Sequence, residues 1–182
     1  MPPQSKILVD TNAYLRLAKT IRPLLFVPFG EEHYCLYIIP ELNQELSNRR
    51  LVSRFPWITE SEYTENRKLT PTLSKNQRQS IAQTFDFIWD YVQTEFPGPS
   101  KVDVRYLAYA IELNVPVVTD DQDMTKLAEV YEVKVMSTLQ LLKIMFDAKH
   151  IDKKTVTGLV EFWRYIGDRP ANLEADYKKY FS

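Results

Sequence analysis

Two short apolar runs in this sequence end abruptly in aspartate, and a helical pattern follows each of them. Residues 6–9 lead into Asp10, and residues 115–119 lead into the acidic stretch 120–123. Short apolar runs bounded by polar residues, alternating with apolar residues at helical spacing, are typical of buried strands joined by helices. This alternation predicts an α/β fold with a parallel sheet, right-handed crossovers and helices on both faces.

Further elements follow from the same patterns. Residues 34–39 predict a strand, and Pro40 is well placed to begin the next helix. We expect a short strand at 133–136 and further helices at these positions: from about Asn12 to Pro23, over 81–92, after Ser100, through 124–131, after Ser137 and over 155–166. The polar stretch 59–79 predicts a mobile loop or lid. No structure is predicted for the tail, 168–182.

Composition excludes several functional classes. The chain has 182 residues, 45% of them hydrophobic, which suffices for a core without crosslinks. One cysteine, Cys35, rules out a disulfide framework, and with only two histidines a zinc site is unfavourable. The four glycines form neither a nucleotide-binding loop nor a nucleophile elbow. Without an apolar run of membrane-spanning length, we expect a cytoplasmic protein with no membrane association.

The formal net charge of -1 gives no overall basic surface for nucleic acid. A basic rim beside an acidic cleft remains compatible with that total. Six cations near the acidic segments are candidates for phosphate contacts, although a solvated helix face explains each equally well: Lys6, Arg16, Arg49, Arg50, Lys101 and Arg105. The aromatic stretch 85–91 offers base stacking, but its helical spacing favours core packing.

Acidic residues stand where the predicted strands end. Asp10 follows the first strand, and Asp121 follows the strand at 115–119. Glu45 lies one turn into the helix after Pro40, and Asp103 lies in the first turn of another helix. Because ligands of open α/β sheets bind outside the carboxyl ends of the strands, all four carboxylates can reach one cleft.

Carboxylates gathered in one cleft require a cation, because like charges raise one another's pKa. Oxygen ligands without nearby histidine or thiol select Mg²⁺ or Mn²⁺. Such an ion activates water and neutralises charge during hydrolysis of a phosphodiester. An all-carboxylate set is poorly suited to acyl transfer, which needs a nucleophile with an adjacent base.

Each of these residues also has an ordinary structural explanation. Asp10 can cap the helix that follows it, and a helical glutamate such as Glu45 normally faces solvent. Asp103 completes a capping box with Ser100, and residues 119–122 match a second capping box. The functional hypothesis therefore depends on the whole set and on no single position.

Together these segments resemble the PIN-domain nucleases, over about residues 7–146. Four short motifs in order carry the resemblance: Ile7-Leu8-Val9-Asp10-Thr11-Asn12, then Ile39-Pro40 with Glu45-Leu46, then Asp103 ahead of Leu107-Ala108, then Thr119-Asp120-Asp121-Gln122-Asp123. The resemblance implies a three-layer PIN-like fold. It also implies a nuclease domain over 1–150, with 51–99 as a helical or loop insertion, and a C-terminal helical extension over 151–182.

Roles carried over by position give one catalytic, metal-binding set: Asp10, Glu45, Asp103 and Asp121. Asp123 is implied as an accessory ligand, and Asn12 and Thr119 as groups that orient a ligand or water. Glu41 is an alternative to Glu45, because it also follows the 34–39 strand. Asp120 is assigned no metal, since the family often has asparagine there.

The resemblance implies an Mg²⁺- or Mn²⁺-dependent endoribonuclease, most plausibly the VapC-like toxin of a toxin–antitoxin pair. Its implied partners are an RNA substrate, an antitoxin protein and a second copy in a homodimer. The alternative is a PIN fold retained as an RNA- or protein-binding scaffold without turnover. A phosphatase of the haloacid-dehalogenase type is disfavoured, because Asn12 stands where that chemistry needs a second aspartate.

Overall fold

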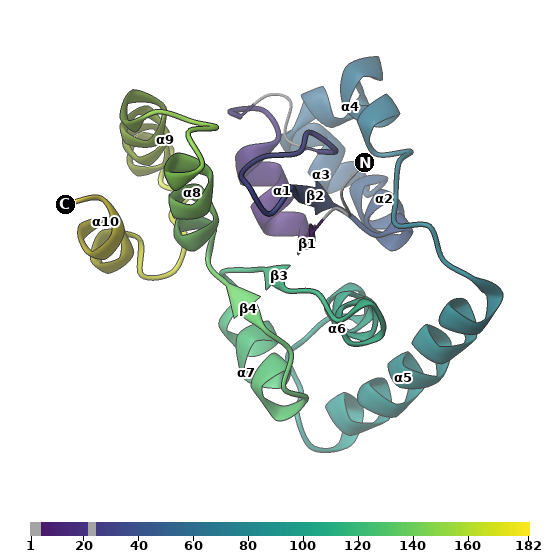
Figure 1. The fold of residues 1–182 in the computed structure, drawn as a ribbon. Coiled ribbons are helices and arrows are strands. Elements are labelled where there is room, and N and C mark those ends of the chain that lie inside the picture. The colour runs from purple at the N-terminus through teal and green to yellow at the C-terminus, as the bar shows by residue number, and fades with distance from the viewer. Residues whose placement is uncertain (1–4, 22–24) are drawn as a thin grey trace.

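The computed structural model describes residues 5–21 and 25–182. At its centre lies a parallel sheet, shown in Figure 1, of four strands in the order β2-β1-β3-β4: β1 (Ser5–Val9), β2 (Tyr34–Tyr37), β3 (Val117–Val118) and β4 (Val135–Met136). Leu8 is paired with Tyr37 on one side and with Val117 on the other. The chain first moves to one side of β1 and later to the other, so the strand order reverses between β1 and β3.

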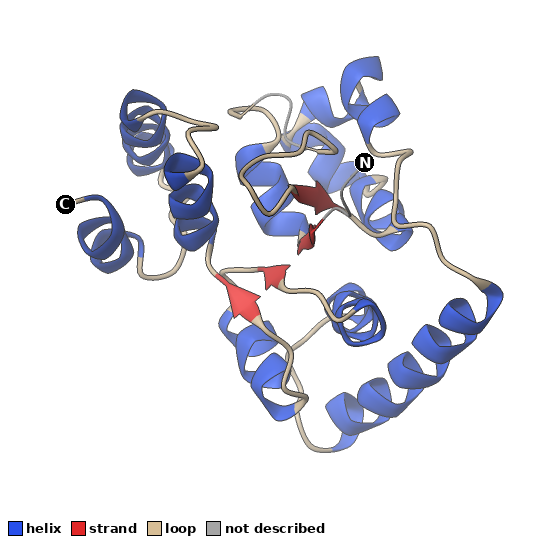
Figure 2. Ribbon diagram, viewed as in Figure 1, coloured by secondary structure: helices blue, strands red, loops and turns tan. Residues whose placement is uncertain are grey.

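Helices fill the connections between strands and continue beyond β4 (Figure 2). In chain order the helical segments are α1 (Thr11–Leu17), α2 (Pro40–Leu46), α3 (Arg49–Arg54), the 3-10 turn η1 (Pro56–Thr59), α4 (Ser61–Asn66), α5 (Lys75–Thr94), α6 (Lys101–Leu113), α7 (Gln122–Val130), α8 (Thr138–Asp147), α9 (Lys153–Ile166) and α10 (Leu173–Phe181). The predicted α/β class, with a parallel sheet between helices, is confirmed.

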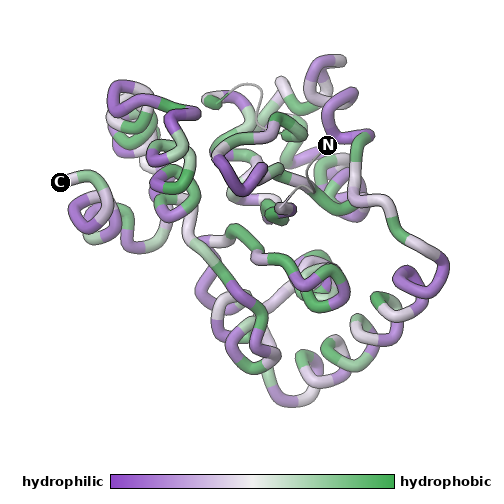
Figure 3. The backbone as a smooth tube through the Cα atoms, in the orientation of Figure 1, coloured by the Kyte–Doolittle hydropathy of each residue, from purple (hydrophilic) through white to green (hydrophobic). Residues whose placement is uncertain are grey.

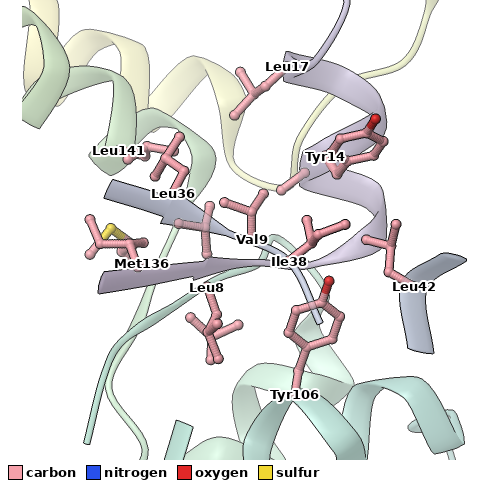
Figure 4. Packing of buried hydrophobic residues seen from close by; sticks show 14 of the residues in the cluster. Leu8, Val9, Tyr14, Leu17, Leu36, Ile38, Leu42, Tyr106, Met136 and Leu141 are labelled. Atoms are coloured by element: carbon pink, nitrogen blue, oxygen red, sulfur yellow. The ribbon is translucent and has the colours of Figure 1, made fainter. Parts of the chain in front are cut away.

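The core lies on both faces of the sheet. Figure 4 shows Tyr14 and Leu17 of α1 on one face, and Tyr106 of α6 on the other. The side chains of β1 from Ile7 to Val9 are fully buried, as expected for a central strand covered on both faces. The outer helix α5 is amphipathic, with polar and apolar residues alternating along it in Figure 3.

Cap residues determine where the helices begin. Ser100 and Ser137 form capping boxes at α6 and α8, and Pro40 is the first residue of α2, all as predicted. The predicted capping box at 119–122 is wrong. Asp121 is the N-cap of α7, and the hydroxyl oxygen of Thr119 accepts a hydrogen bond from the Asp121 backbone N–H instead.

Two predictions about the first half of the chain need correction. The helix expected to run to Pro23 ends at Leu17, and Pro23 itself lies outside the described residues. Past that point the Thr20 hydroxyl donates to the Arg16 carbonyl in a turn, which satisfies a helix-end acceptor without another helical residue. The stretch 59–79, predicted as a mobile loop or lid, contains α4 and the start of α5.

A buried arginine fixes that stretch to the rest of the protein. Arg67 is only 6% exposed, and its guanidinium donates to the Tyr14 hydroxyl, the Ile58 carbonyl and the Asn43 side chain. These contacts connect α1, α2 and η1 to the residue that ends α4. The polar sequence concealed these contacts, because the side chain that makes them is charged.

The C-terminal tail, for which the residue pattern alone predicts no element, forms α10 within the region expected as a helical extension. Its Phe181 is buried and packs edge to face against Phe146 of α8, with ring centroids 5.9 Å apart. Arg164 of α9 forms a two-pronged ion pair with Glu174 of α10, at 2.8 and 2.5 Å. Among the described residues, no helix combines the length and the hydrophobicity that crossing a membrane requires.

Candidate functional site

Asp10 lies at the carboxyl end of β1 and is 3% exposed. It caps α1, because one carboxylate oxygen accepts the Ala13 backbone N–H at 2.7 Å. Burial raises the pKa of Asp10 to about 7, against hydrogen bonds from Thr119 and Ala13 that lower it, and the nearby Asp120 and Asp103 raise it further. The carboxylate of Asp10, at the end of β1, is therefore shielded from solvent and lies near two other acidic residues.

Asp103 connects the acidic residues of different elements. Its carboxylate accepts the Ser100 backbone N–H at 2.7 Å in the capping box of α6. Burial raises the pKa of Asp103, the hydrogen bonds to Ser100 lower it, and the charges of Asp121 and Glu45 raise it again. Asp103 thus interacts electrostatically with residues of α2 and of the β3–α7 junction, as well as with Asp10.

Glu45 of α2 is half-buried, and the Thr11 hydroxyl donates a short hydrogen bond to it. Thr11 is adjacent to Asp10 in the chain, so this bond fixes Glu45 beside the carboxyl end of β1. Sequence reasoning did not assign a role to Thr11. The only sequence signal for Thr11 was its place in the Asp-Thr-Asn trio, where a threonine is equally well explained as an ordinary residue of the first helical turn.

Asp121 follows β3 and caps α7 through the Met124 backbone N–H at 2.7 Å. Thr119, 2% exposed, connects it to Asp10: the Thr119 hydroxyl hydrogen-bonds Asp10 and accepts the Asp121 backbone N–H. At the carboxyl ends of the adjacent strands β1 and β3, the Thr119 hydroxyl therefore interacts with the Asp10 carboxylate and accepts a bond from the Asp121 backbone. This is the point where the strand order reverses, the usual ligand position in open α/β sheets.

The remaining predicted residues lie around this centre. Asn12 is exposed in the first turn of α1. Asp123 is exposed and lies against Gly98, where a Cβ would stand 2.8 Å from an Asp123 carboxylate oxygen and where φ is +146°. Asp120, assigned no metal, accepts from the backbone N–H and hydroxyl of Thr138 and pairs with Arg16 at 3.2 Å. Asp120 therefore has a structural role between α1 and α8.

Two residues beside the acidic group carry buried polar atoms for which the described residues provide no hydrogen-bond partner. One is the Tyr106 hydroxyl, on a fully buried side chain of α6, and the other is one carboxylate oxygen of Glu41. Burial raises the pKa of Tyr106 well above its usual value, and the charges of Asp10, Glu45 and Glu41 also raise it. Glu41, the alternative to Glu45, thus borders the same site. No sequence signal marked Tyr106, because its helical spacing is that of an ordinary core residue.

The acidic side chains do not form a ready-made metal cage. Within 5–21 and 25–182, no three His, Cys, Asp or Glu side chains are grouped closely enough to hold a metal ion. Asp103 and Asp121 each use one carboxylate oxygen for a helix cap, and for their second oxygens the described chain supplies no hydrogen-bond donor. The donor set is all oxygen, which matches Mg²⁺ or Mn²⁺ in chemistry, and metal ligation stays a prediction.

The six candidate cations divide into three groups. Arg16 is occupied by Asp120 and Asp168, and the Lys6 ammonium lies over the Tyr37 ring. Arg49 and Arg50 are exposed on α3. Lys101 and Arg105 of α6 lie over aromatic rings of α5, on the same helix as Asp103.

Comparison with known proteins gives little further information. No family model matches the sequence, and no curated protein matches it. The solved structure of FitAcB from Neisseria gonorrhoeae is similar to this chain at 17% sequence identity and a TM-score of 0.44, over 72% of this chain and 97% of that one. What this protein does is therefore inferred from its own residues.

Proposed function

We propose that this protein is an Mg²⁺- or Mn²⁺-dependent endoribonuclease of the PIN type. One observation carries the proposal: carboxylates from four separate segments interact around the carboxyl ends of β1 and β3. Asp103 interacts with Asp10, Glu45 and Asp121. Thr11 donates to Glu45, and Thr119 interacts with Asp10 and accepts from the backbone of Asp121. A fold gains no stability from gathering like charges, so such a group favours a cationic ligand.

The residues fit a hard divalent cation. Burial and mutual repulsion raise the pKa of Asp10 and of Asp103, and both effects are relieved when a cation is present. We assign cation binding to Asp10, Glu45, Asp103 and Asp121, with Asp123 as an accessory ligand. When bound, the ion would supply an activated water and neutralise charge on the phosphate. Thr119 orients the Asp10 carboxylate, and Thr11 orients that of Glu45.

The biological role that we propose is the toxin of a toxin–antitoxin pair, active in the cytoplasm and working as a homodimer. This part of the proposal depends on the sequence resemblance, with an antitoxin protein as the regulating partner. The second candidate, a binding scaffold without turnover, is favoured by the absence of a preformed metal cage among the described side chains. Metal binding and cleavage separate the two candidates.

We expect the purified protein to cleave single-stranded RNA with Mg²⁺ or Mn²⁺ and to be inactive in EDTA. Asp121→Asn should lower the cleavage rate by about 100-fold, because it removes a carboxylate from the ion, yet asparagine still caps α7. Cleavage is measured on a labelled RNA, and Mn²⁺ affinity by calorimetry. The matched control is Asp86→Asn, which removes an exposed carboxylate from α5.

Equal cleavage by Asp121→Asn and the parent would contradict the site assignment. RNA binding without cleavage, and no measurable Mn²⁺ binding by the parent, would instead establish the scaffold. The toxin role is tested separately, by induced expression. Growth should stop with the parent and continue with Asp121→Asn, and arrest by both would contradict a nuclease toxin.

A further inference from the structure

The contact between α5 and α6 combines stacked aromatic rings with cations that form no ion pair within the described part of the chain. We infer that this α5–α6 seam, formed by Arg78, Phe85, Trp89, Lys101 and Arg105, binds the single-stranded RNA segment that leads into the acidic site. The inference rests on the proposed nuclease function and adds the location of the bound strand.

In the seam, cations of α6 lie over aromatic rings of α5. The Lys101 ammonium lies 5.6 Å from the ring centroid of Trp89, and the Arg105 guanidinium lies 3.8 Å from that of Phe85. The two rings are stacked, with centroids 6.2 Å apart and planes inclined by 8°. Since Phe85 and Trp89 are one helical turn apart, as are Lys101 and Arg105, the cations and the rings form two parallel rows.

Lys101 and Arg105 are available to an anion, and Arg78 uses one guanidinium nitrogen to donate to the Leu73 carbonyl at 3.0 Å. None of the ion pairs found among residues 5–21 and 25–182 includes Arg78, Lys101 or Arg105. Two acidic residues near the seam already have other contacts: Glu112 accepts from the Ser80 hydroxyl at 2.6 Å, and Glu41 interacts with Tyr109. Lys101 and Arg105 lie one helical turn apart and Arg78 lies with Arg105 near Tyr109, while the exposed Asp86 and Asp90 of α5 form none of the ion pairs found among the described residues.

The seam is continuous with the acidic site at both ends. Lys101 is in the first turn of α6, two residues before Asp103. At the other end, Tyr109 interacts electrostatically with Arg105, Arg78 and Glu41, and burial followed by the Glu41 charge raises the pKa of Tyr109 to about 12. A strand whose phosphates contact the seam is therefore delivered to the carboxylates, while the acidic centre itself repels phosphate in the absence of a cation.

The chemistry favours an unpaired strand. Lysine and arginine contact phosphates without regard to sequence, and a partly exposed tryptophan stacks on bases only when these are not paired. Trp89 is half-buried, whereas Trp57 and Trp163 are 8% and 1% exposed. Quenching of tryptophan fluorescence by RNA therefore reports on Trp89.

The test measures RNA binding by the full chain in EDTA, where cleavage does not occur. The probe is a fluorescein-labelled ten-nucleotide oligo(U), followed by anisotropy from 50 to 200 mM salt. Three phosphate contacts predict a slope of log affinity against log salt of about -2, since each contributes about -0.7 for a single strand. The double variant Lys101→Gln, Arg105→Gln should reduce the slope to about -0.7 and lower the affinity by about tenfold or more.

The matched control is Lys126→Gln, Lys178→Gln, which makes the same charge change on exposed residues of α7 and α10. An equal loss in the control and the seam variant would overturn the inference, as would tryptophan quenching that persists in Trp89→Phe. Quenching by duplex RNA of the same length equal to that by oligo(U) would also overturn it. RNA binding at the seam without cleavage in Mg²⁺ would contradict only the proposed function, and cleavage with an unaffected seam variant would contradict only the inference.

Discussion

Asp10→Asn should stabilise the metal-free protein at pH 8 by about 2 kcal/mol while lowering RNA cleavage by about 100-fold or more. Burial is the main reason that the pKa of Asp10 is raised from 3.8 to about 7. Asparagine retains an oxygen to accept the Ala13 backbone N–H, so the cap of α1 survives. The substitution removes a buried charge and a proposed cation ligand together, which gives opposite effects on stability and on activity.

The stability effect has a defined pH dependence. Because the folded pKa of Asp10 exceeds the unfolded value of 3.8, the native state binds a proton that the unfolded state lacks between about pH 4 and pH 7. The contribution of Asp10 to stability is fully present below pH 4 and is lost as the pH rises through 7. This rise in the pKa of Asp10 corresponds to about 4 kcal/mol of stability lost by pH 8. Asparagine avoids that loss, but burying its amide costs part of the gain.

Urea unfolding at pH 4 and pH 8, in EDTA, measures this difference between the variant and the parent. We expect Asp10→Asn to be about 2 kcal/mol less stable than the parent at pH 4, where Asp10 is already protonated, and about 2 kcal/mol more stable at pH 8. Adding Mn²⁺ at pH 8 should stabilise the parent and leave Asp10→Asn almost unchanged. A variant that is less stable at pH 8, or that gains as much as the parent from Mn²⁺, would contradict the assignment of Asp10.

Arg67→Met should lower the free energy of unfolding by about 3 kcal/mol. The substitution removes the donors to Tyr14, Ile58 and Asn43, at 2.9, 2.6 and 3.0 Å, and leaves the oxygens of Tyr14 and Ile58 buried without them. Methionine keeps most of the side-chain volume, so the loss reports on hydrogen bonds more than on packing.

Urea unfolding followed by far-ultraviolet circular dichroism measures the effect of Arg67→Met. The matched control is Arg50→Met, on the exposed surface of α3, which should change stability by less than about 0.5 kcal/mol. Equal stabilities of the two variants would show that the contacts of Arg67 contribute nothing measurable. The residues around α4 would then behave as the mobile loop that their sequence suggests.

Local sequence patterns predicted the structural features that depend only on residues close together in the chain. Ser100 and Ser137 cap helices because cap chemistry acts over three residues, and the strand ends at Asp10 and before Asp121 follow from short apolar runs. The placement of these two aspartates at one edge follows from the parallel order of the strands, which the strand–helix alternation implies. Fold class and the position of the acidic edge are therefore accessible from sequence.

Contacts between distant residues were not accessible. Arg67 reaches Tyr14 across 53 residues, and its polar surroundings in the sequence suggested exposure. Arg16 was a candidate for phosphate contact, yet it pairs with Asp120 and Asp168, at distances of 3.2 and 3.3 Å. Tyr106 follows a helical pattern that records burial but not the direction of its hydroxyl. For Arg67 and Arg16 a tertiary partner, absent from any local pattern, determines the role.

Three of the proposed ligands also start helices: Asp10 for α1, Asp121 for α7 and Asp103 within the capping box of α6. Replacing these side chains therefore weakens helix caps, even in a relative that no longer needs catalysis. Asparagine, serine or threonine would persist at the first two positions in such an inactive descendant, whereas alanine would weaken folding. Comparing relatives by the type of side chain retained there would then distinguish lost enzymes from active ones.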